Sequence, residues 1–181
     1  MTRGTVWFTG LSGAGKSTVA ATLKQMLDDL GVPAILLDGD DLREGLNADL
    51  GFNEEHRREN VRRVGEVAML FAKAERLALV TVISPFADGR RAVRARHREM
   101  GIPFVEIYVA TPLEVCEERD PKGLYARARR GEVARFTGIS SPYEVPEHPE
   151  LSVQTVDRSP AESAKEVLAL LETERLLLGP Q

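Results

Sequence analysis

The sequence contains few of the residues that form disulfides, metal centres or aromatic platforms. Its 181 residues include one cysteine, one tryptophan, three tyrosines and three histidines. One cysteine excludes an internal disulfide and fits a reducing compartment, so we expect a cytoplasmic protein in which Cys116 packs as a small apolar side chain. His56, His97 and His148 lack the spacing of metal ligands, and we expect them to be structural or exposed.

Long apolar runs and a strong excess of one charge are absent as well. No run approaches the roughly 18 residues of a membrane-spanning helix, and the N-terminus lacks a basic-plus-apolar signal segment. The net charge of −4 provides no general basic field, which argues against nucleic-acid and membrane partners. Five arginines lie between positions 90 and 98, but no aromatic residues are interleaved with them, which favours a solvated helix face.

Short apolar runs alternate with amphipathic stretches along the chain. The sequences TPLE (111–114) and SPAE (159–162) predict capping boxes with proline at the first helical position. The alternation predicts one α/β domain over residues 1–181, a doubly wound and mainly parallel sheet with helices on both faces. We expect strands at 5–9, 34–37, 78–83, 104–109 and 151–156, and helices at 16–30, 53–75, 89–100 and from 159 to about 178, just before Gly179.

The segment from about 120 to 150 breaks this rhythm. It is rich in arginine, glycine and proline, and it is too long for an ordinary connection, so we expect an active-site lid. Tyr125, Phe136 and Tyr143 argue against a fully disordered loop, because aromatic residues are depleted in such segments.

A glycine-rich phosphate loop follows the first expected strand. GLSGAGKS (10–17) matches G-x-x-x-x-G-K-[ST] and precedes an expected helix, which is the context the motif needs. Lys16 would place its charge on the terminal phosphates of ATP, a catalytic role, and the Ser17 hydroxyl can ligate Mg²⁺. The residues expected to bind the nucleotide are Gly10, Leu11, Ser12, Gly13, Ala14, Gly15, Lys16, Ser17 and Thr18.

The position of the acidic residues indicates how the nucleotide is used. No N-K-x-D sequence is present, so a GTPase switch is not indicated. The strand expected at 78–83 ends in Ser84 and Pro85 rather than in the acid that is usual for an ATPase. The acids instead follow the strand at 34–37, where LLDGDDLREGL (36–46) contains Asp38 and Asp40. This placement favours a small-molecule kinase.

Basic and amide side chains gather after these acids. Arg43 follows the acidic turn, and Arg57 and Asn60 lie at i, i+3 on the next helix, so they point toward one face. Phe52 precedes that helix in a glycine-containing loop, where burial in the core is not forced. Each residue alone has an ordinary structural interpretation, but together they favour a pocket for a flat base with an anionic tail.

Several stretches follow one another in the order seen in adenylylsulfate kinases, and the chain resembles this family from about residue 4 to residue 171. The DGDxxR…LGF…R…N block and FTGISSPYE are much more specific than the phosphate loop, which many families share. Members phosphorylate the 3′-hydroxyl of adenosine 5′-phosphosulfate (APS) with MgATP, giving 3′-phosphoadenylyl sulfate (PAPS) and ADP. The matching stretches are GLSGAGKST, LDGDDLREGLNADLGF, RRENVRRVGEVAMLF, ISPF, RDPKGLYARA and FTGISSPYEVPEHPEL.

The resemblance implies a P-loop NTPase-type fold, ATP and Mg²⁺ as cofactors, and a role for each matching residue. Asp40 would orient the hydroxyl and contact Mg²⁺ through water, with Asp38 in support. Ser84 corresponds to a serine that is phosphorylated in some members. Arg119 and the stretch 122–130 would serve the donor nucleotide and the lid. The acceptor residues would be Arg43, Arg57 and Asn60 on phosphosulfate and ribose, Phe52 and Phe136 around the adenine, and Asp40, Ile83, Ser84 and Lys122.

Other interpretations stay open at this point. The chain could act on a nucleoside monophosphate or a sugar acid, although the paired phenylalanines argue against sugar acids, or it could be a nucleotide-binding regulatory module. The family usually has asparagine where this chain has Asp41, which adds a negative charge near bound phosphates. The resemblance further implies a homodimer. The length leaves no room for a fused sulfurylase, so we expect a stand-alone kinase whose association with a separate sulfurylase is undetermined.

Overall fold

A five-stranded sheet forms the centre of the computed structural model, which describes residues 3–174 and 176–177. The strands have the order β2-β3-β1-β4-β5, and every neighbouring pair runs parallel. The central strand β1 therefore ends at the switch point of the sheet, where ligands of doubly wound folds bind. The strands are β1 (Gly4–Thr9), β2 (Ala34–Asp38), β3 (Leu77–Thr81), β4 (Phe104–Val109) and β5 (Leu151–Val153).

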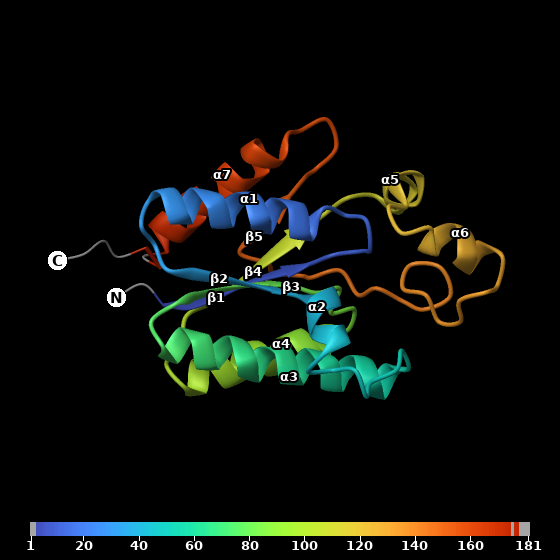
Figure 1. Cartoon of the computed structure of the whole chain (residues 1–181), viewed down its shortest axis with the longest axis horizontal. Helices are drawn as coiled ribbons and strands as arrows, with labels where there is room; N and C mark the ends of the chain where they lie inside the picture. Colours follow the sequence, from blue (N-terminus) through green and yellow to red (C-terminus); the bar gives the residue numbers. More distant parts are fainter. Residues whose placement is uncertain (1–2, 175, 178–181) are drawn as a thin grey trace.

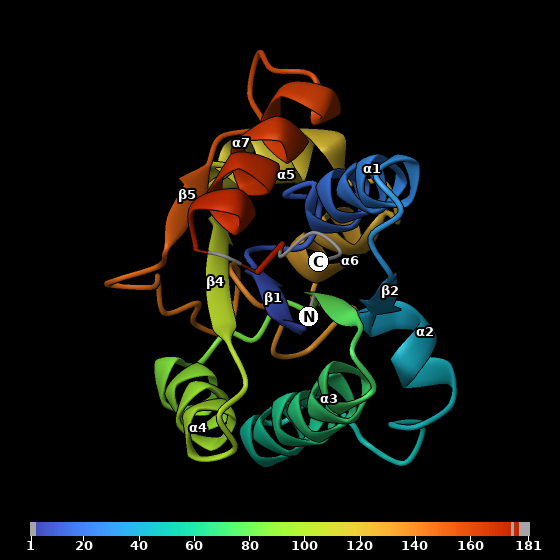
Figure 2. The same cartoon turned by 90° about the vertical axis from the view of Figure 1, so that its left-hand side faces the viewer.

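Helices cover both faces of the sheet, as the sequence predicts (Figure 1). Helices α1 (Lys16–Asp29) and α7 (Pro160–Thr173) pack together on one face, and α3 (Glu54–Lys73) and α4 (Ala87–Glu99) pack together on the other. The end-on view in Figure 2 shows the same two layers on either side of the strands. Three short helices lie at the carboxyl ends of the strands, namely α2 (Gly39–Glu44), α5 (Leu113–Arg119) and α6 (Leu124–Arg129).

The alternating side chains of β1 explain why both faces need helices. Val6 and Phe8 belong to the core shared with α1 and α7, whereas Trp7 belongs to the core shared with α3. All three side chains are fully buried. Burial of each such side chain contributes about 1.5–3 kcal/mol to stability. An apolar strand of this kind is stable only between two covering layers, which holds the end of β1 rigidly in place.

One of the two predicted capping boxes is wrong. Helix α7 has the predicted box, in which Ser159 and Glu162 satisfy each other's backbone N–H groups. Helix α5 begins at Leu113 with Pro112 as N-cap and has no side-chain cap. The Thr111 hydroxyl donates instead to the Ala14 carbonyl at 2.8 Å, so it is engaged by the phosphate loop.

Three predicted element ends are also wrong. Strands β3 and β5 end at Thr81 and Val153, earlier than expected, because their pairing with β2 and β4 stops there. Helix α7 ends at Thr173 because the backbone N–H of Leu176 turns back to the Leu171 carbonyl at 2.9 Å and Leu176 enters the core. The predicted stop at Gly179 lies outside the described residues.

The basic face of α4 is only partly solvated, which corrects the prediction. Arg91, Arg96 and Arg98 are exposed as expected. Arg90 is buried and forms an ion pair with Glu106 of β4 at 2.7 Å, and Arg94 pairs with Glu106 and Glu150. The physical reason is that β4 presents Glu106 toward α4, and a buried carboxylate requires a charged partner.

The expectations for cysteine and histidine are confirmed. Cys116 is fully buried in α5. His97 is buried against Thr5, His56 accepts a hydrogen bond from the Gly51 backbone, and His148 is exposed. Within residues 3–174 and 176–177, no helix is long and apolar enough to cross a membrane.

Candidate active site

The phosphate loop joins the end of β1 to the start of α1. Gly10 has a φ of 150°, and a side chain there would meet the Val109 carbonyl oxygen at 2.7 Å. Gly15 has a φ of 101° and forms the N-cap of α1 without a side-chain bond. These conformations favour glycine and direct backbone N–H groups and the helix N-terminus toward one point, as phosphate binding requires.

Lys16 lies inside this loop. Its Nζ donates to the carbonyls of Gly10 at 3.0 Å and Leu11 at 2.7 Å, and the residue is only 8% exposed. Burial lowers the pKa of Lys16 to about 8, against the opposing effects of Cys116, Asp38 and Asp40. A phosphate group placed in the loop would restore the full charge of this ammonium.

Ser17 at the start of α1 and Asp38 at the end of β2 are joined by a hydrogen bond. Ser17 Oγ donates to Asp38 Oδ2 at 2.5 Å, and Thr81 Oγ1 donates to the same oxygen at 2.8 Å. Burial alone would raise the pKa of Asp38, but hydrogen bonds from Ser17, the Asp40 backbone and Thr81 hold that pKa below its usual value. The carboxylate is therefore ionised beside the hydroxyl that ligates Mg²⁺ in such loops.

The donor set fits Mg²⁺ bound together with a nucleotide. No group of three or more histidine, cysteine, aspartate or glutamate residues among those described could hold a metal by itself. Mg²⁺ normally keeps several waters and takes one or two protein ligands together with substrate phosphates. Ser17 and the ionised Asp38 match that pattern.

Asp40 lies two residues further along, at the start of α2. Asp38 caps this helix by accepting a hydrogen bond from the Asp40 backbone at 2.9 Å. The Asp40 carboxylate is exposed and forms an ion pair with Lys122, which follows α5. The ion pair ties Asp40 to the segment predicted to be a lid.

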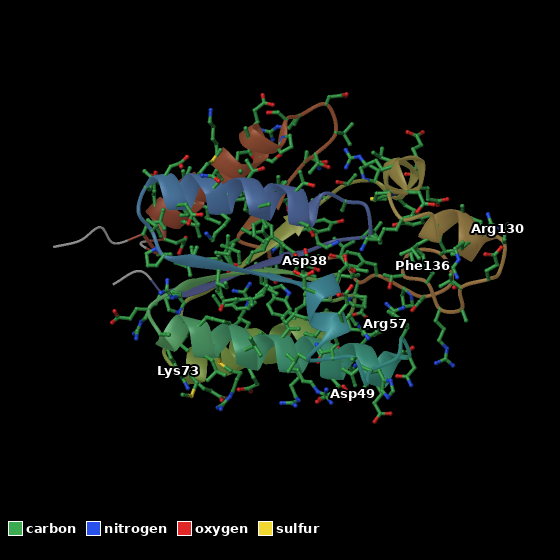
Figure 3. All side chains as sticks on the ribbon, viewed as in Figure 1. Asp38, Asp49, Arg57, Lys73, Arg130 and Phe136 are labelled. Carbon is green, nitrogen blue, oxygen red and sulfur yellow. The ribbon has the colours of Figure 1, made fainter. Side chains whose placement is uncertain are left out.

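A cavity of about 1160 Å³ joins the phosphate loop to the predicted acceptor residues. Figure 3 labels Asp38 at the end of β2, Arg57 on α3 and Phe136 after α6, which come from three different segments of the chain. Gly10, Leu11 and Ala14 do not line the cavity. The predicted site residues that line it are Ser12, Gly13, Gly15, Lys16, Ser17, Thr18, Asp38, Asp40, Arg43, Phe52, Arg57, Asn60, Ile83, Ser84, Arg119, Lys122 and Phe136.

Arg57 connects α3 to the segment that follows α6. Its Nε donates to the Phe52 carbonyl at 2.7 Å, and its other nitrogens donate to Thr137 Oγ1 and the Arg135 carbonyl. The residue is only 8% exposed and lines the cavity. Arg57 therefore provides fixed positive charge in the cavity wall.

Arg43 and Phe52 form a second part of the same wall. The Arg43 guanidinium lies 4.7 Å from the centroid of the Phe52 ring and donates to the carbonyls of Leu50 and Gly51. Phe52 is 63% exposed, so the core does not occupy its ring. Phe136 is buried and packs edge-on against Tyr125 at 4.9 Å. The adenine sandwich between Phe52 and Phe136 stays a prediction.

Asn60 is oriented by a residue that the sequence analysis missed. Its Oδ1 accepts a hydrogen bond from Asn47 Nδ2 at 3.1 Å, and Asn47 is fully buried. The Asn60 Nδ2 group then remains available as a donor in the cavity wall. Asn47 gave no signal because a lone asparagine in LNADLGF looks like an ordinary turn residue.

The Ser84 hydroxyl is engaged by the protein. Ser84 is 2% exposed, its Oγ donates to Thr9 Oγ1 at 2.9 Å, and it accepts a hydrogen bond from Trp7 Nε1 at 3.1 Å. Phosphorylation would remove the proton that Ser84 donates to Thr9 and would place a phosphate on a buried oxygen. This geometry favours a structural role for the hydroxyl.

Arg119 lies on the nucleotide side of the cavity. It donates to Thr155 Oγ1 and to the Thr155 carbonyl, both at 2.9 Å, and Thr155 Oγ1 donates to the Ala14 carbonyl at 3.0 Å. Arg119 is thereby tied to the phosphate loop, and its contact with the donor nucleotide stays a prediction. Thr155 was missed because it falls within the strand expected at 151–156.

The segment from 120 to 150 is folded, although it contains little regular secondary structure apart from α6. Tyr125 is buried and its hydroxyl donates to the Ser12 carbonyl at 2.9 Å, so the aromatic residues anchor the segment as expected. Arg127, Val133 and Ala134 add further residues of this segment to the cavity wall. Its opening and closing as a lid stays a prediction.

Known proteins are similar to this chain in sequence. The sequence profile of the adenylylsulphate kinase family matches residues 2–154. The adenylyl-sulfate kinase of Clostridium acetobutylicum is 51% identical over 172 residues, covering 95% of this chain and 84% of the relative. The bifunctional enzyme CysN/CysC of Mycobacterium tuberculosis is 54% identical over 169 residues, and that match covers 93% of this chain but 27% of the relative.

The fold agrees with a solved structure of the same family. The APS kinase CysC of Mycobacterium tuberculosis, in complex with AMPPNP and APS, superposes with a TM-score of 0.92 and 54% identity. The superposition covers 95% of this chain and 99% of that one. Together with the profile match over most of the sequence, this agreement shows that the chain belongs to the adenylylsulphate kinase family.

Proposed function

We propose that this chain transfers the γ-phosphate of ATP to the 3′-hydroxyl of APS, giving PAPS and ADP, as a step of sulfate activation. The observation that supports this most directly is the shared cavity. It joins Lys16 and Ser17 of the phosphate loop to Arg43, Phe52 and Arg57, with Asp40 also in its wall. One cavity can therefore hold a nucleotide donor and an anionic aromatic acceptor at the same time.

The donor end supports MgATP. The phosphate loop and Lys16 would hold the β- and γ-phosphates, and Ser17 with the ionised Asp38 would hold Mg²⁺. When bound, Mg²⁺ neutralises charge on the transferred phosphate. Arg119 would support the loop through Thr155 and Ala14.

The acceptor end supports a nucleotide with an anionic tail. Arg43 and Arg57 supply two positive charges beside the exposed ring of Phe52. The ring would stack on the adenine of APS, the guanidinium groups would hold the phosphosulfate, and Asn60 Nδ2 would donate to a ribose or phosphate oxygen. A sugar acid would leave the Phe52 face without a partner.

We propose Asp40 as the group that orients the acceptor hydroxyl. Its exposed carboxylate lies in the cavity wall and pairs with Lys122. The 3′-oxygen would form a bond to the γ-phosphorus while the bond to the β,γ-bridging oxygen breaks, and the hydroxyl proton would leave late toward Asp40. In such a loose transition state the carboxylate acts mainly by orientation. Direct transfer needs no phosphorylated Ser84, whose hydroxyl is buried.

Release of ADP from MgATP with a panel of acceptors tests the proposal. We expect APS to accelerate ADP release far more than AMP or gluconate does. A higher rate with AMP than with APS would identify a nucleoside monophosphate kinase. No acceleration by any acceptor would identify a nucleotide-binding regulatory module.

The Arg57→Ala variant tests the acceptor assignment. Loss of a charged partner costs about 1.5–3 kcal/mol, so we expect the KM for APS to rise at least about tenfold. The KM for ATP should change little. Equal increases in both constants would indicate general damage through the lost contacts to Thr137 and Arg135.

The remaining expectations are part of the same proposal. A homodimer, a stand-alone kinase and a cytoplasmic location stay predictions. Light scattering at several protein concentrations would measure the oligomeric state, and a mass that stays at one protomer would contradict the homodimer.

A further inference from the structure

Arg90 of α4 bonds to the backbone of residues 83–85, which line the cavity, and to the backbone of residues 143–144, which do not line it but follow the lining residues 132–137 along the chain. Its Nη1 donates to the Ser84 carbonyl and its Nη2 donates to the Glu144 carbonyl, both at 2.6 Å. Its Nε lies 2.7 Å from Glu106 Oε1. Arg90 is only 2% exposed and does not line the cavity, so substrate cannot be its ligand.

The first of these segments is the acceptor loop, residues 83–85, which lies in the cavity wall. Ser84 has a φ of 42°, a conformation that serine adopts only when its surroundings hold it there. The surroundings do so through four polar contacts. They are Trp7 Nε1 to Ser84 Oγ, Ser84 Oγ to Thr9 Oγ1, Thr9 Oγ1 to the Ile83 carbonyl, and Arg90 to the Ser84 carbonyl.

The second segment is the chain at residues 143–144, which is fastened to the acceptor loop. The Glu144 backbone N–H donates to the Pro85 carbonyl at 2.8 Å, and Glu144 Oε2 accepts from the Ala87 N–H at the start of α4 at 2.6 Å. Tyr143 Oη lies 2.9 Å from Thr9 Oγ1. Arg90 completes this junction by holding the Glu144 carbonyl.

The junction connects two walls of the acceptor pocket. A few residues upstream of Tyr143, the same chain segment provides the Arg135 carbonyl and the Thr137 hydroxyl that hold Arg57. It also provides Phe136, which lines the cavity. The acceptor loop and the Arg57 wall are therefore linked through residues 143–144, and Arg90 bonds to both sides of the link.

We propose that Arg90 is a positioning residue for the acceptor, holding the acceptor loop and residues 143–144 in register so that the pocket fits APS. The proposal rests on the proposed function. The guanidinium is suited to this task because its rigid fork reaches Glu106, Ser84 and Glu144 in three directions at once. A lysine could keep the ion pair with Glu106 but could not reproduce that fork. Arg90→Lys therefore separates positioning from simple charge pairing.

Arg94 provides a matched control. It lies one turn further along α4 and pairs with the same Glu106, at 3.3 Å, but no hydrogen bond joins it to Ser84 or Glu144. Both variants, Arg90→Lys and Arg94→Lys, keep a positive charge next to Glu106. A role limited to charge pairing would make the two variants behave alike.

The test measures the KM for APS and for ATP in the full-length wild type and both variants, with thermal melting to confirm folding. We expect Arg90→Lys to raise the KM for APS about tenfold, the effect of losing one charged hydrogen bond, and to leave the KM for ATP nearly unchanged. Arg94→Lys should change neither constant. Equal rises in both constants for Arg90→Lys, or equal behaviour of the two variants, would overturn the proposal.

The fluorescence of Trp7 supplies a readout that does not depend on activity. Trp7 is the single tryptophan of the chain, it is fully buried, and its Nε1 donates to Ser84 Oγ. Displacement of the acceptor loop should change its emission in Arg90→Lys and leave it unchanged in Arg94→Lys. An unchanged Trp7 emission in Arg90→Lys would refute the proposal that Arg90 holds the acceptor loop in position. If wild-type protein shows no APS-dependent ADP release, the proposed function fails, and the emission still decides whether Arg90 holds the loop.

A second variant keeps the proposal testable if Arg90→Lys does not fold. Tyr143→Phe removes only the hydroxyl that bonds to Thr9 and keeps the ring that lies 5.8 Å from the Arg90 guanidinium. We expect a smaller rise in the KM for APS, about twofold to tenfold, from the loss of one neutral hydrogen bond. If neither the KM for APS nor the Trp7 emission changes in Tyr143→Phe, the result would count against the proposed positioning of the acceptor loop.

Discussion

Ser17 Oγ donates a 2.5 Å hydrogen bond to Asp38 Oδ2 and thereby joins the phosphate loop to the end of β2. Asp38 also accepts from Thr81 at the end of β3 and from the Asp40 backbone at the start of α2. One carboxylate thus links three segments at the position where Mg²⁺ and the γ-phosphate are proposed to bind. Asp40, although nearby, is exposed and pairs with Lys122 instead.

This arrangement predicts that Asp38 and Asp40 differ in what they support. Asp38→Asn should weaken binding of MgATP about tenfold or more, because the ionised oxygen beside Ser17 is lost. Calorimetric titration with ATP in the presence and absence of Mg²⁺ measures the effect. Glu44→Gln, an exposed change on the helix α2 that Asp38 caps, serves as the control. Unchanged Mg²⁺-dependent binding in Asp38→Asn would contradict the assignment of the metal site.

Asp40→Asn should instead affect turnover. We expect the kcat to fall by roughly 10²- to 10⁴-fold, the range for a positioned acid–base group, while ATP binding stays nearly intact. Steady-state ADP release and calorimetric titration separate the two quantities. A kcat equal to that of the wild type would remove Asp40 from its proposed role.

The lowered pKa of Lys16 predicts a proton uptake that accompanies ATP binding. Burial places that pKa at about 8, and the phosphates of ATP would raise it. Above about pH 8 the free protein has therefore lost part of this proton, so ATP binding should take it up and the affinity should fall as the pH rises. Calorimetry in two buffers of different ionisation enthalpy measures the uptake.

Two variants identify the group that takes up this proton. Lys16→Arg keeps its charge at all of these pH values and should abolish the uptake. Lys24→Met, on the exposed face of α1 where Lys24 pairs with Asp28, should leave the uptake unchanged. An uptake that persists in Lys16→Arg would mean that another group provides it.

His97 predicts a loss of stability in mild acid. Burial lowers its pKa below 6.5, against weaker opposing effects of the Val93 carbonyl and Glu66. The unfolded chain then binds the proton more readily than the folded chain, so this stabilisation is complete above pH 6.5 and declines as the pH falls below it. The slope is at most about 1.4 kcal/mol per pH unit for one proton.

Melting temperatures measured between about pH 5 and pH 7, where histidine titrates, test this prediction. His97→Gln should show a smaller pH dependence than the wild type, whatever its absolute stability. His148→Gln, at an exposed position, should keep the wild-type slope. Equal slopes for wild type and His97→Gln would assign the pH dependence to other groups.

Local patterns in the sequence determined most of the fold and the chemistry of the phosphate loop. Alternating apolar runs and helix signals predict a doubly wound parallel sheet, because a strand that is apolar on both sides requires helices on both faces. The spacing of glycines and Lys16 in residues 10–17 predicts phosphate binding, because that loop needs no distant partner to point its N–H groups at one site. The acceptor residues Arg43, Phe52, Arg57 and Asn60 follow from the same kind of local spacing and from family motifs.

The tertiary structure alone decided which of these side chains meet and which are already engaged by the protein. Arg90 looked like one of five solvated arginines, yet it is buried because Glu106 of β4, which is distant in sequence, lies beneath α4. The Thr111 hydroxyl bonds to the phosphate loop rather than capping α5, and the Ser84 hydroxyl bonds to Thr9 and Trp7. The physical reason is the same in each case. Burial requires a polar group to find a partner, and the parallel sheet brings that partner from a part of the chain that local pattern cannot reach.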